Sequence, residues 1–204
     1  MMKEQLRRKE TGIVTKQDIL EKQAKTAYLS IGSNLGNRFI NIEKAKYELM
    51  KKGIRIVKTS SYYETLSWPN PKNPKFYNIV LKIKTILNEI ELLLICKEIE
   101  KFLGRKKSIK NSPRECDIDI IDFNKKHSKN MINLPHTRMH KRNFVLLPLF
   151  EIDKDWKHPI FNINIKHLIF LLSNSDITSI KKIWISVIIN NVKFWRINKQ
   201  SKNL

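Results

Sequence analysis

Residues 113–121 read Pro-Arg-Glu-Cys-Asp-Ile-Asp-Ile-Ile, an apolar and β-branched run that predicts a buried β-strand. Side chains two residues apart on a strand point to the same face, so Asp117 and Asp119 should project together. Two poorly solvated carboxylates need a compensating cation. Mg²⁺ suits them because it binds oxygen ligands from few carboxylates together with substrate phosphates, and Arg114 could hold phosphate oxygens bidentately. The alternative is a solvent-facing Asp pair with Arg114 as its salt-bridge partner.

The segments around this strand predict an alternation of strands and helices. Strands are expected at residues 27–31, 54–63 and 76–86, and helices at residues 41–51 and 89–103. Asn88 should cap the second helix. Together with the aspartate strand, the order β-α-β-β-α-β is the ferredoxin-like α+β arrangement, an antiparallel sheet covered by helices on one face. A further apolar element at residues 144–150 is interrupted by Pro148.

The formal net charge of +21 invites a nucleic-acid hypothesis, but the identity of the basic residues argues against it. There are 31 Lys and only 9 Arg, beside 30 Ile and 19 Asn but 3 Ala and 5 Gly. Lys, Ile and Asn have AT-rich codons, so drift in an AT-rich genome explains the pattern without a polyanionic partner. A basic nucleic-acid-binding module is kept as the competing hypothesis, with the charge as its only support.

Cysteine usage and hydropathy predict a cytoplasmic protein. Cys96 and Cys116 lie in apolar surroundings without a CxxC pattern, which is typical of reduced core thiols. Residues 1–25 carry charges of both signs and no apolar core, unlike a signal peptide. No uninterrupted apolar run approaches the roughly 18 residues that a membrane span needs.

Two basic segments flank the aspartate strand in the sequence. Arg105 and its neighbouring lysines follow the end of the predicted second helix, where they could complement the helix dipole or clamp a triphosphate. Residues 135–144 add His136 and further cations, among them Arg142. By contrast, the glycine segment 32–36 lacks the spacing and the Lys-Ser/Thr of a P-loop, so a strand-to-helix turn is favoured.

Asn78 and Phe76 lie two residues apart on one face of a predicted strand. A buried amide needs partners that both donate and accept hydrogen bonds. The core could supply these partners. A flat heterocycle stacked on the aromatic ring is the other possibility.

Taken together, several ordered segments resemble the 6-hydroxymethyl-7,8-dihydropterin pyrophosphokinase family of folate biosynthesis. The segments are AYLSIGSNLGN at 27–37, SSYYET at 60–65, Phe-Tyr-Asn at 76–78, the Ile99-Glu100 and Gly104-Arg105 pairs, PRECDIDII at 113–121, and 135–144 followed by Pro148-Leu149. The resemblance covers roughly residues 26–184. It implies a pyrophosphokinase domain there, after a polar extension at 1–25 and before an unassigned basic tail at 185–204.

The resemblance also implies roles for individual residues. Asp117 and Asp119 would bind two Mg²⁺ ions that bridge the phosphates of ATP. Arg105 and Arg114 would be catalytic. In the implied reaction, the hydroxymethyl oxygen of the pterin attacks the β-phosphorus of ATP, and AMP leaves. The implied contacts to ATP are Arg105, Lys107, Arg114, Ile120, His136 and Arg142, and those to the pterin are Thr65, Leu66, Trp68, Phe76, Asn78 and Phe144. Small molecules would be the only partners of a monomer, with no nucleic acid and no membrane.

The chain departs from the family pattern just before the aspartate strand. Asn111 and Ser112 stand where an aromatic residue and Gly are common, and the loop at 106–112 is about one residue short. Lys107 replaces a frequent Arg, and Leu66 replaces a frequent Pro. A family member that binds its ligands but turns over slowly therefore stays open beside the active enzyme.

Overall fold

The computed structural model describes residues 23–105, 111–129 and 131–183. Lys107, the tail at 185–204 and nearly all of the extension at 1–25 lie outside these residues, so the predictions for them stay predictions. The main elements are β1 (Lys25–Ser33), α3 (Arg38–Lys51), β2 (Arg55–Thr59), β3 (Tyr62–Thr65), β4 (Phe76–Thr85), α4 (Glu89–Phe102), β5 (Asp117–Phe123) and α5 (Asn143–Ile152). The shorter ones are β6 (Ser128–Lys129), β7 (Asn133–Leu134), the 3-10 turn Met139–Lys141, α6 (Ile165–Phe170), α7 (Asn174–Thr178) and β8 (Lys181–Ile183).

The strands form one antiparallel sheet in the order β5-β1-β4-β3-β8, with β2 also paired to β4. β1 therefore lies between β4 and β5, as the ferredoxin-like arrangement requires when β2 and β3 together serve as its second strand. The predicted α+β class and strand order are confirmed. β6 and β7 form a separate hairpin.

The single strand expected at 54–63 is wrong in one respect, because it is divided into β2 and β3. Between them, Ser60 donates its N–H to the Val80 carbonyl and accepts the Val80 N–H on its hydroxyl oxygen. Ser61 turns away, and its N–H and hydroxyl both donate to Glu151 of α5. The side chain of Ser60 thus replaces a backbone acceptor, and the pairing register shifts at this point.

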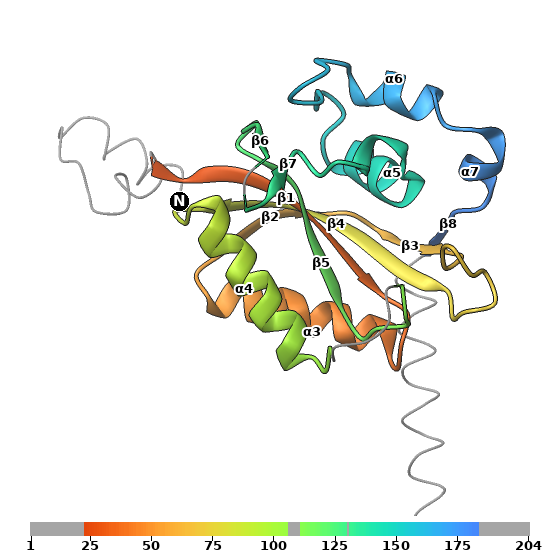
Figure 1. Cartoon of the computed structure of the whole chain (residues 1–204), viewed down its shortest axis with the longest axis horizontal. Helices are drawn as coiled ribbons and strands as arrows, with labels where there is room; N and C mark the ends of the chain where they lie inside the picture. Colours follow the sequence, from red (N-terminus) through yellow and green to blue (C-terminus); the bar gives the residue numbers. More distant parts are fainter. Residues whose placement is uncertain (1–22, 106–110, 130, 184–204) are drawn as a thin grey trace, which may run out of the picture.

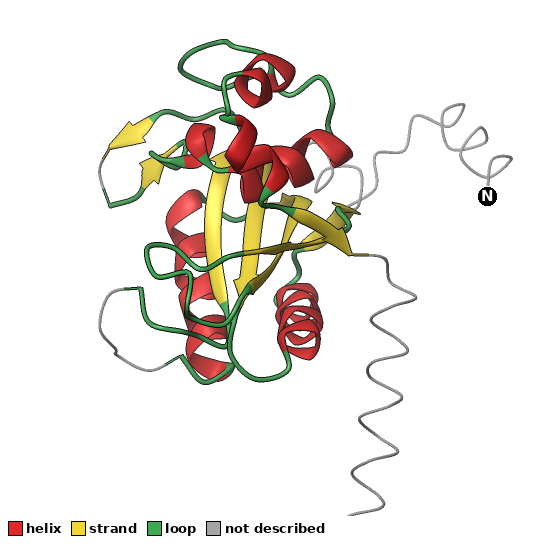
Figure 2. Ribbon diagram, turned by 90° about the vertical axis from the view of Figure 1, so that its right-hand side faces the viewer, coloured by secondary structure: helices red, strands yellow, loops and turns green. Residues whose placement is uncertain are grey.

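Helices cover both faces of the sheet, not one face as predicted (Figures 1 and 2). On one face, α3 and α4 enclose a core that takes alternate residues of the central strands, such as Leu29, Leu81 and Ile118. On the other face, α5 and α6 pack over Tyr28, Val80 and Ile121. The residues predicted as an interrupted element at 144–150 make up most of α5. Pro148 is buried inside that helix.

The first helical layer follows directly from the sequence. α4 begins at a complete capping box, in which Asn88 accepts the N–H groups of Ile90 and Glu91 while Glu91 accepts the Asn88 N–H. This confirms the predicted cap. α3 begins at Arg38, earlier than the predicted start at residue 41, because the side chain of Asn37 caps it by accepting the Ile40 N–H.

Both cysteines are free and buried, as predicted. Their thiols have raised pKa values because burial disfavours the thiolate, and that of Cys96 reaches about 12. Within the described ranges, no helix combines the length and apolar character that crossing a bilayer demands.

Candidate active site

The candidate site occupies the polar end of the sheet face that α5 covers. Strand register places Gly32 of β1 between Asn78 of β4 and Asp117 of β5. In the next row of this face, Ser30 lies between Val80 and Asp119. Paired residues of antiparallel strands share a face, so an amide and two carboxylates face the same side. The apolar end of the face packs under α5, and the polar end continues from it.

Asp117 is held by two arginines that precede it in the chain. Its carboxylate lies 2.7 Å from Nη1 of Arg105 and 3.3 Å from Nη1 of Arg114. Arg105 follows α4, whereas Arg114 precedes β5. The two guanidinium groups therefore converge on one carboxylate of β5.

Asp119 has its own pair of basic partners from the segment before α5. Nη1 of Arg142 lies 3.2 Å from its carboxylate, and Nε2 of His136 lies 3.8 Å away. The segment is fixed to the strand because the His136 N–H donates to the Ile121 carbonyl. Burial lowers the pKa of His136, and the nearby Asp119 only partly opposes this, so the imidazole is neutral near pH 7. Burial also lowers the pKa of Arg142, although a guanidinium stays charged.

Arg114 carries an unused donor at the site. Its Nε is buried and has no hydrogen-bond partner among the described residues. A buried donor without a partner is costly, and an anionic oxygen would satisfy it. The arrangement is therefore suited to a phosphate group beside Asp117.

The remaining polar residues form a second half of the site on β3 and β4. Asn78 is 4% exposed, and its amide donates to the Thr65 hydroxyl over 2.9 Å, which leaves its oxygen toward Gly32. A Cβ on Gly32 would lie 2.9 Å from that oxygen and 3.4 Å from the ring of Phe76. The absence of a side chain at Gly32 thus leaves the amide edge and the ring accessible from β1.

The other residues predicted for the pterin lie around this half with different exposures. Leu66 and Trp68 are 49% and 73% exposed on the loop after β3. Phe144, in the first turn of α5, is partly buried against the core beneath that helix. The guanidinium of Arg142 lies 5.3 Å from the centre of its ring. Ile120 is buried in the core on the opposite face from the two aspartates, so any contact it makes with a nucleotide must come from its backbone.

Asn34 was not singled out from the sequence. It is 3% exposed and joins three segments of the chain. Its Oδ1 accepts the Arg114 N–H over 2.8 Å, and its Nδ2 donates to the Ser67 hydroxyl and the Pro74 carbonyl, both over 3.1 Å. The turn at 32–36 thereby ties the loop that carries Leu66 and Trp68 to the segment that carries Arg114. Asn34 lies inside the glycine turn, so the sequence alone does not distinguish it from an ordinary turn residue. Its role is evident only from its contacts in the structure.

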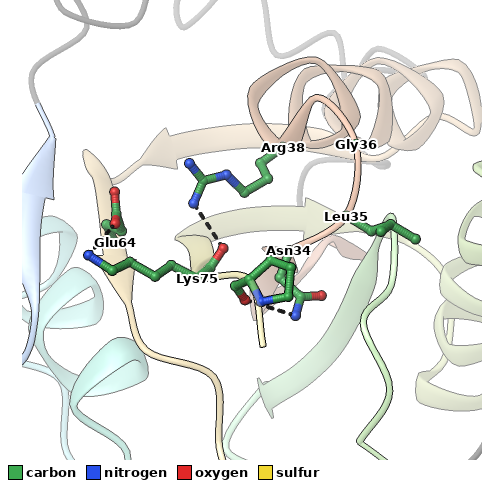
Figure 3. A pocket seen from close by; sticks show the side chains of 7 residues that line it. Asn34, Leu35, Gly36, Arg38, Glu64 and Lys75 are labelled. Atoms are coloured by element: carbon green, nitrogen blue, oxygen red, sulfur yellow. Dashed lines mark hydrogen bonds and ion pairs between the residues drawn. The ribbon is translucent and has the colours of Figure 1, made fainter. Parts of the chain in front are cut away.

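A cavity of about 370 Å³ opens next to Asn34 but is not the predicted site (Figure 3). Its lining includes Arg38, Glu64 and Lys75, in which Arg38 donates to the Lys75 carbonyl over 2.8 Å and Lys75 pairs with Glu64. Glu64 alternates with Tyr63 and Thr65 along β3, so it faces the opposite side of the sheet. None of the residues predicted for ATP or pterin lines this cavity.

The carboxylate oxygens of the two aspartates fit a hard divalent ion whose remaining ligands come from a substrate. Among the described residues, no group of three or more His, Cys, Asp or Glu side chains could hold a metal ion. Asp117 and Asp119 supply carboxylate oxygens on one face, which is the sparse protein share that Mg²⁺ takes when substrate phosphates provide other ligands.

Known proteins resemble this chain in sequence and in fold. Residues 28–154 match the family model described as 7,8-dihydro-6-hydroxymethylpterin-pyrophosphokinase (HPPK). A 2-amino-4-hydroxy-6-hydroxymethyldihydropteridine pyrophosphokinase of Aquifex aeolicus is 41% identical over 137 residues, which cover 67% of this chain and 85% of that protein. The Bacillus subtilis protein of the same name is 38% identical, with 62% of this chain and 77% of that protein covered.

Longer proteins contain a matching region as well. The folic acid synthesis protein fol1 of Pneumocystis carinii is 40% identical over 74% of this chain, but the match spans only 20% of its length. A crystal structure of the Plasmodium falciparum HPPK-DHPS protein superposes with a TM-score of 0.57 at 19% identity, covering 71% of this chain and 42% of that one. The structural match shows a common fold.

Proposed function

The chain belongs to the 7,8-dihydro-6-hydroxymethylpterin pyrophosphokinase family, and we propose that its polar sheet face performs the reaction of that family. In this reaction, diphosphate passes from ATP to 6-hydroxymethyl-7,8-dihydropterin, and AMP is the other product. The step belongs to folate biosynthesis. The observation that carries the proposal is the pair Asp117 and Asp119 on one strand face, each in contact with arginines from outside that strand.

The triphosphate of ATP is proposed to bind at the aspartates. Arg105, Arg114 and Arg142 supply guanidinium groups around the two carboxylates, and the free Nε of Arg114 supplies a further donor. His136 would act as a neutral donor or acceptor to a phosphate oxygen. Lys107 and the backbone at Ile120 are proposed as additional contacts.

Two Mg²⁺ ions are proposed at Asp117 and Asp119, where they would neutralise charge on the phosphate oxygens. The arginines that contact these carboxylates would then pair with phosphate instead. The guanidinium groups would remain paired with negative charge, because the phosphates of ATP would replace the carboxylates as their partners.

The pterin is proposed to bind against β3 and β4. Asn78 presents its amide edge beside Gly32, and Phe76 and Phe144 are proposed to stack on the two faces of the ring. Thr65, Leu66 and Trp68 would complete this half of the site. Asn78 and Asp117 both pair with Gly32 of β1, so a pterin at Asn78 would lie one strand away from phosphates held at Asp117.

These residues suggest catalysis by positioning and charge neutralisation. In-line attack of the hydroxymethyl oxygen on the β-phosphorus requires the two substrates to be aligned, and no nucleophile of the protein is needed. Arg105 and Arg114 would stabilise the charge that moves onto the leaving AMP and the transferred group.

The function is tested by measuring AMP release with ATP, Mg²⁺ and the pterin alcohol, and after omission of each component. The proposal predicts AMP only in the complete mixture. AMP formed at an equal rate without the pterin alcohol would instead identify an ATP-hydrolysing activity. If the complete mixture gave no AMP, binding of an ATP analogue and the pterin by calorimetry would identify a family member that binds without turnover.

The protein is proposed to act as a monomer. Size-exclusion chromatography with light scattering tests this, and a stable dimer would contradict it. We also propose a reducing compartment, the cytoplasm, since both cysteines are free and buried. The domain is proposed to span residues 26–184.

A further inference from the structure

Glu100 is a buried acid directly behind the candidate site. It lies near the end of α4 with a side chain 1% exposed. Its Oε1 accepts the Ile118 N–H over 2.7 Å, on the strand residue between the two aspartates. Its Oε2 lies 2.5 Å from Nη1 of Arg105, and the half-exposed Lys97 also pairs with it. A buried carboxylate is stable only with such partners.

Arg105 is shared between this buried acid and the site. The same Nη1 contacts Glu100 on one side and Asp117 on the other, at 2.5 and 2.7 Å. Burial by itself would lower the pKa of Arg105, but the two carboxylates outweigh it and raise the pKa. The Arg105 N–H also donates to the Glu100 carbonyl over 3.0 Å, so backbone and side chain are both tied to α4.

We propose that Glu100 is a positioning residue that keeps Arg105 directed at the triphosphate when Asp117 is committed to its metal. This rests on the proposed function. A carboxylate that binds a divalent ion attracts a neighbouring guanidinium more weakly. Arg105 would therefore lose one of the two carboxylates that hold its side chain in place. Glu100 is too buried to be a ligand of either substrate, and its bond to Ile118 fixes it to the strand. It therefore remains as the second anchor.

The test is Glu100→Gln, which keeps an oxygen for the Ile118 N–H and removes the charge. We expect about tenfold weaker binding of a non-hydrolysable Mg²⁺–ATP analogue by calorimetry, together with a similar fall in kcat/KM for ATP. The KM for the pterin alcohol should stay unchanged. Glu100→Asp keeps the charge and should recover part of the loss.

Double variants with Arg105→Ala separate positioning from a general structural role. If Glu100 acts through Arg105, Glu100→Gln should cause no further loss of analogue binding once Arg105 is removed. An equal additional loss in that background would overturn the proposal, and so would unchanged binding in Glu100→Gln itself. If Glu100→Gln does not fold, a Glu100→Asp variant that folds and binds the analogue no better than Arg105→Ala would refute the anchor role of the charge.

Asp122→Asn is the matched control. Asp122 is also 1% exposed and accepts a backbone N–H, from Lys125, but it lies at the far end of β5 against Trp156. It should change stability without changing analogue binding. Wild-type protein that binds the analogue but releases no AMP would count against the proposed function and not against the role of Glu100.

Discussion

At the scale of single residues, the charge of each aspartate is matched by cations from outside β5. The alternation of Asp117, Ile118 and Asp119 was enough to predict that both acids share a face, because a strand has a fixed period of two. The partners of Glu100 and Asn34 could not be predicted in the same way. Their bonds to Ile118 and Arg114 join residues 18 and 80 positions apart, and no local period encodes such a pair.

Gly32→Ala should weaken the pterin half of the site selectively. The added Cβ would lie 2.9 Å from the Asn78 oxygen, closer than real contacts allow, so the amide must move. The expected result is about a tenfold higher KM for the pterin alcohol with little change in binding of an ATP analogue, a difference of about 1.4 kcal/mol. Steady-state kinetics with calorimetry measures both. An unchanged pterin KM would show that Asn78 does not read this ligand.

At the scale of elements, the start of α4 could be predicted because its cap is local. Asn88 and Glu91 lie three residues apart and form the box that starts α4. The division of β2 from β3 could not be predicted from the sequence, because it depends on hydrogen bonds from Ser60 to Val80 and from Ser61 to Glu151. The second helical layer was missed for another reason. The residues of α5 are almost all apolar, so they show no helical period, and Pro148 argued for an interruption.

Asn88→Ala should destabilise α4 without affecting the site. Loss of the cap leaves the Ile90 and Glu91 N–H groups without their acceptor, at a cost of about 1 kcal/mol in the free energy of unfolding. Urea denaturation followed by circular dichroism measures the change, and AMP release under native conditions should be the same as in the wild type. A midpoint equal to the wild-type value would mean that the box contributes nothing to stability.

At the scale of the whole molecule, helices cover both faces of the sheet, and the proposed site lies at the polar end of the face under α5. The layer on that face depends in part on His158, which is 3% exposed between Trp156 and the stacked ring of Phe161. Burial, with a smaller effect of the facing His140, lowers the pKa of His158 to about 4. Its Nδ1 accepts the N–H groups of Ile160 and Phe161, which a proton would displace.

His158 should therefore make the fold less stable in acid. Well above pH 6.5 the residue is neutral in both states and contributes no pH dependence. Between about 6.5 and 4 the unfolded chain binds a proton that the folded chain does not, so stability falls by at most about 3 kcal/mol. Unfolding measured from pH 7 to 4 should show a shallower decline for His158→Asn than for the wild type. The exposed His167→Asn serves as control, and equal slopes for all three proteins would contradict the assignment.

The central claim is that the aspartate pair on β5 holds the metal ions that diphosphate transfer requires. The most direct measurement is the rate of AMP release by Asp119→Ala at saturating ATP, Mg²⁺ and pterin alcohol, beside Asp155→Ala, which changes an exposed acid after α5. The account predicts that Asp119→Ala loses activity by about a hundredfold or more, since charge on the phosphates would no longer be neutralised, while Asp155→Ala keeps the wild-type rate. Full activity in Asp119→Ala would contradict the account.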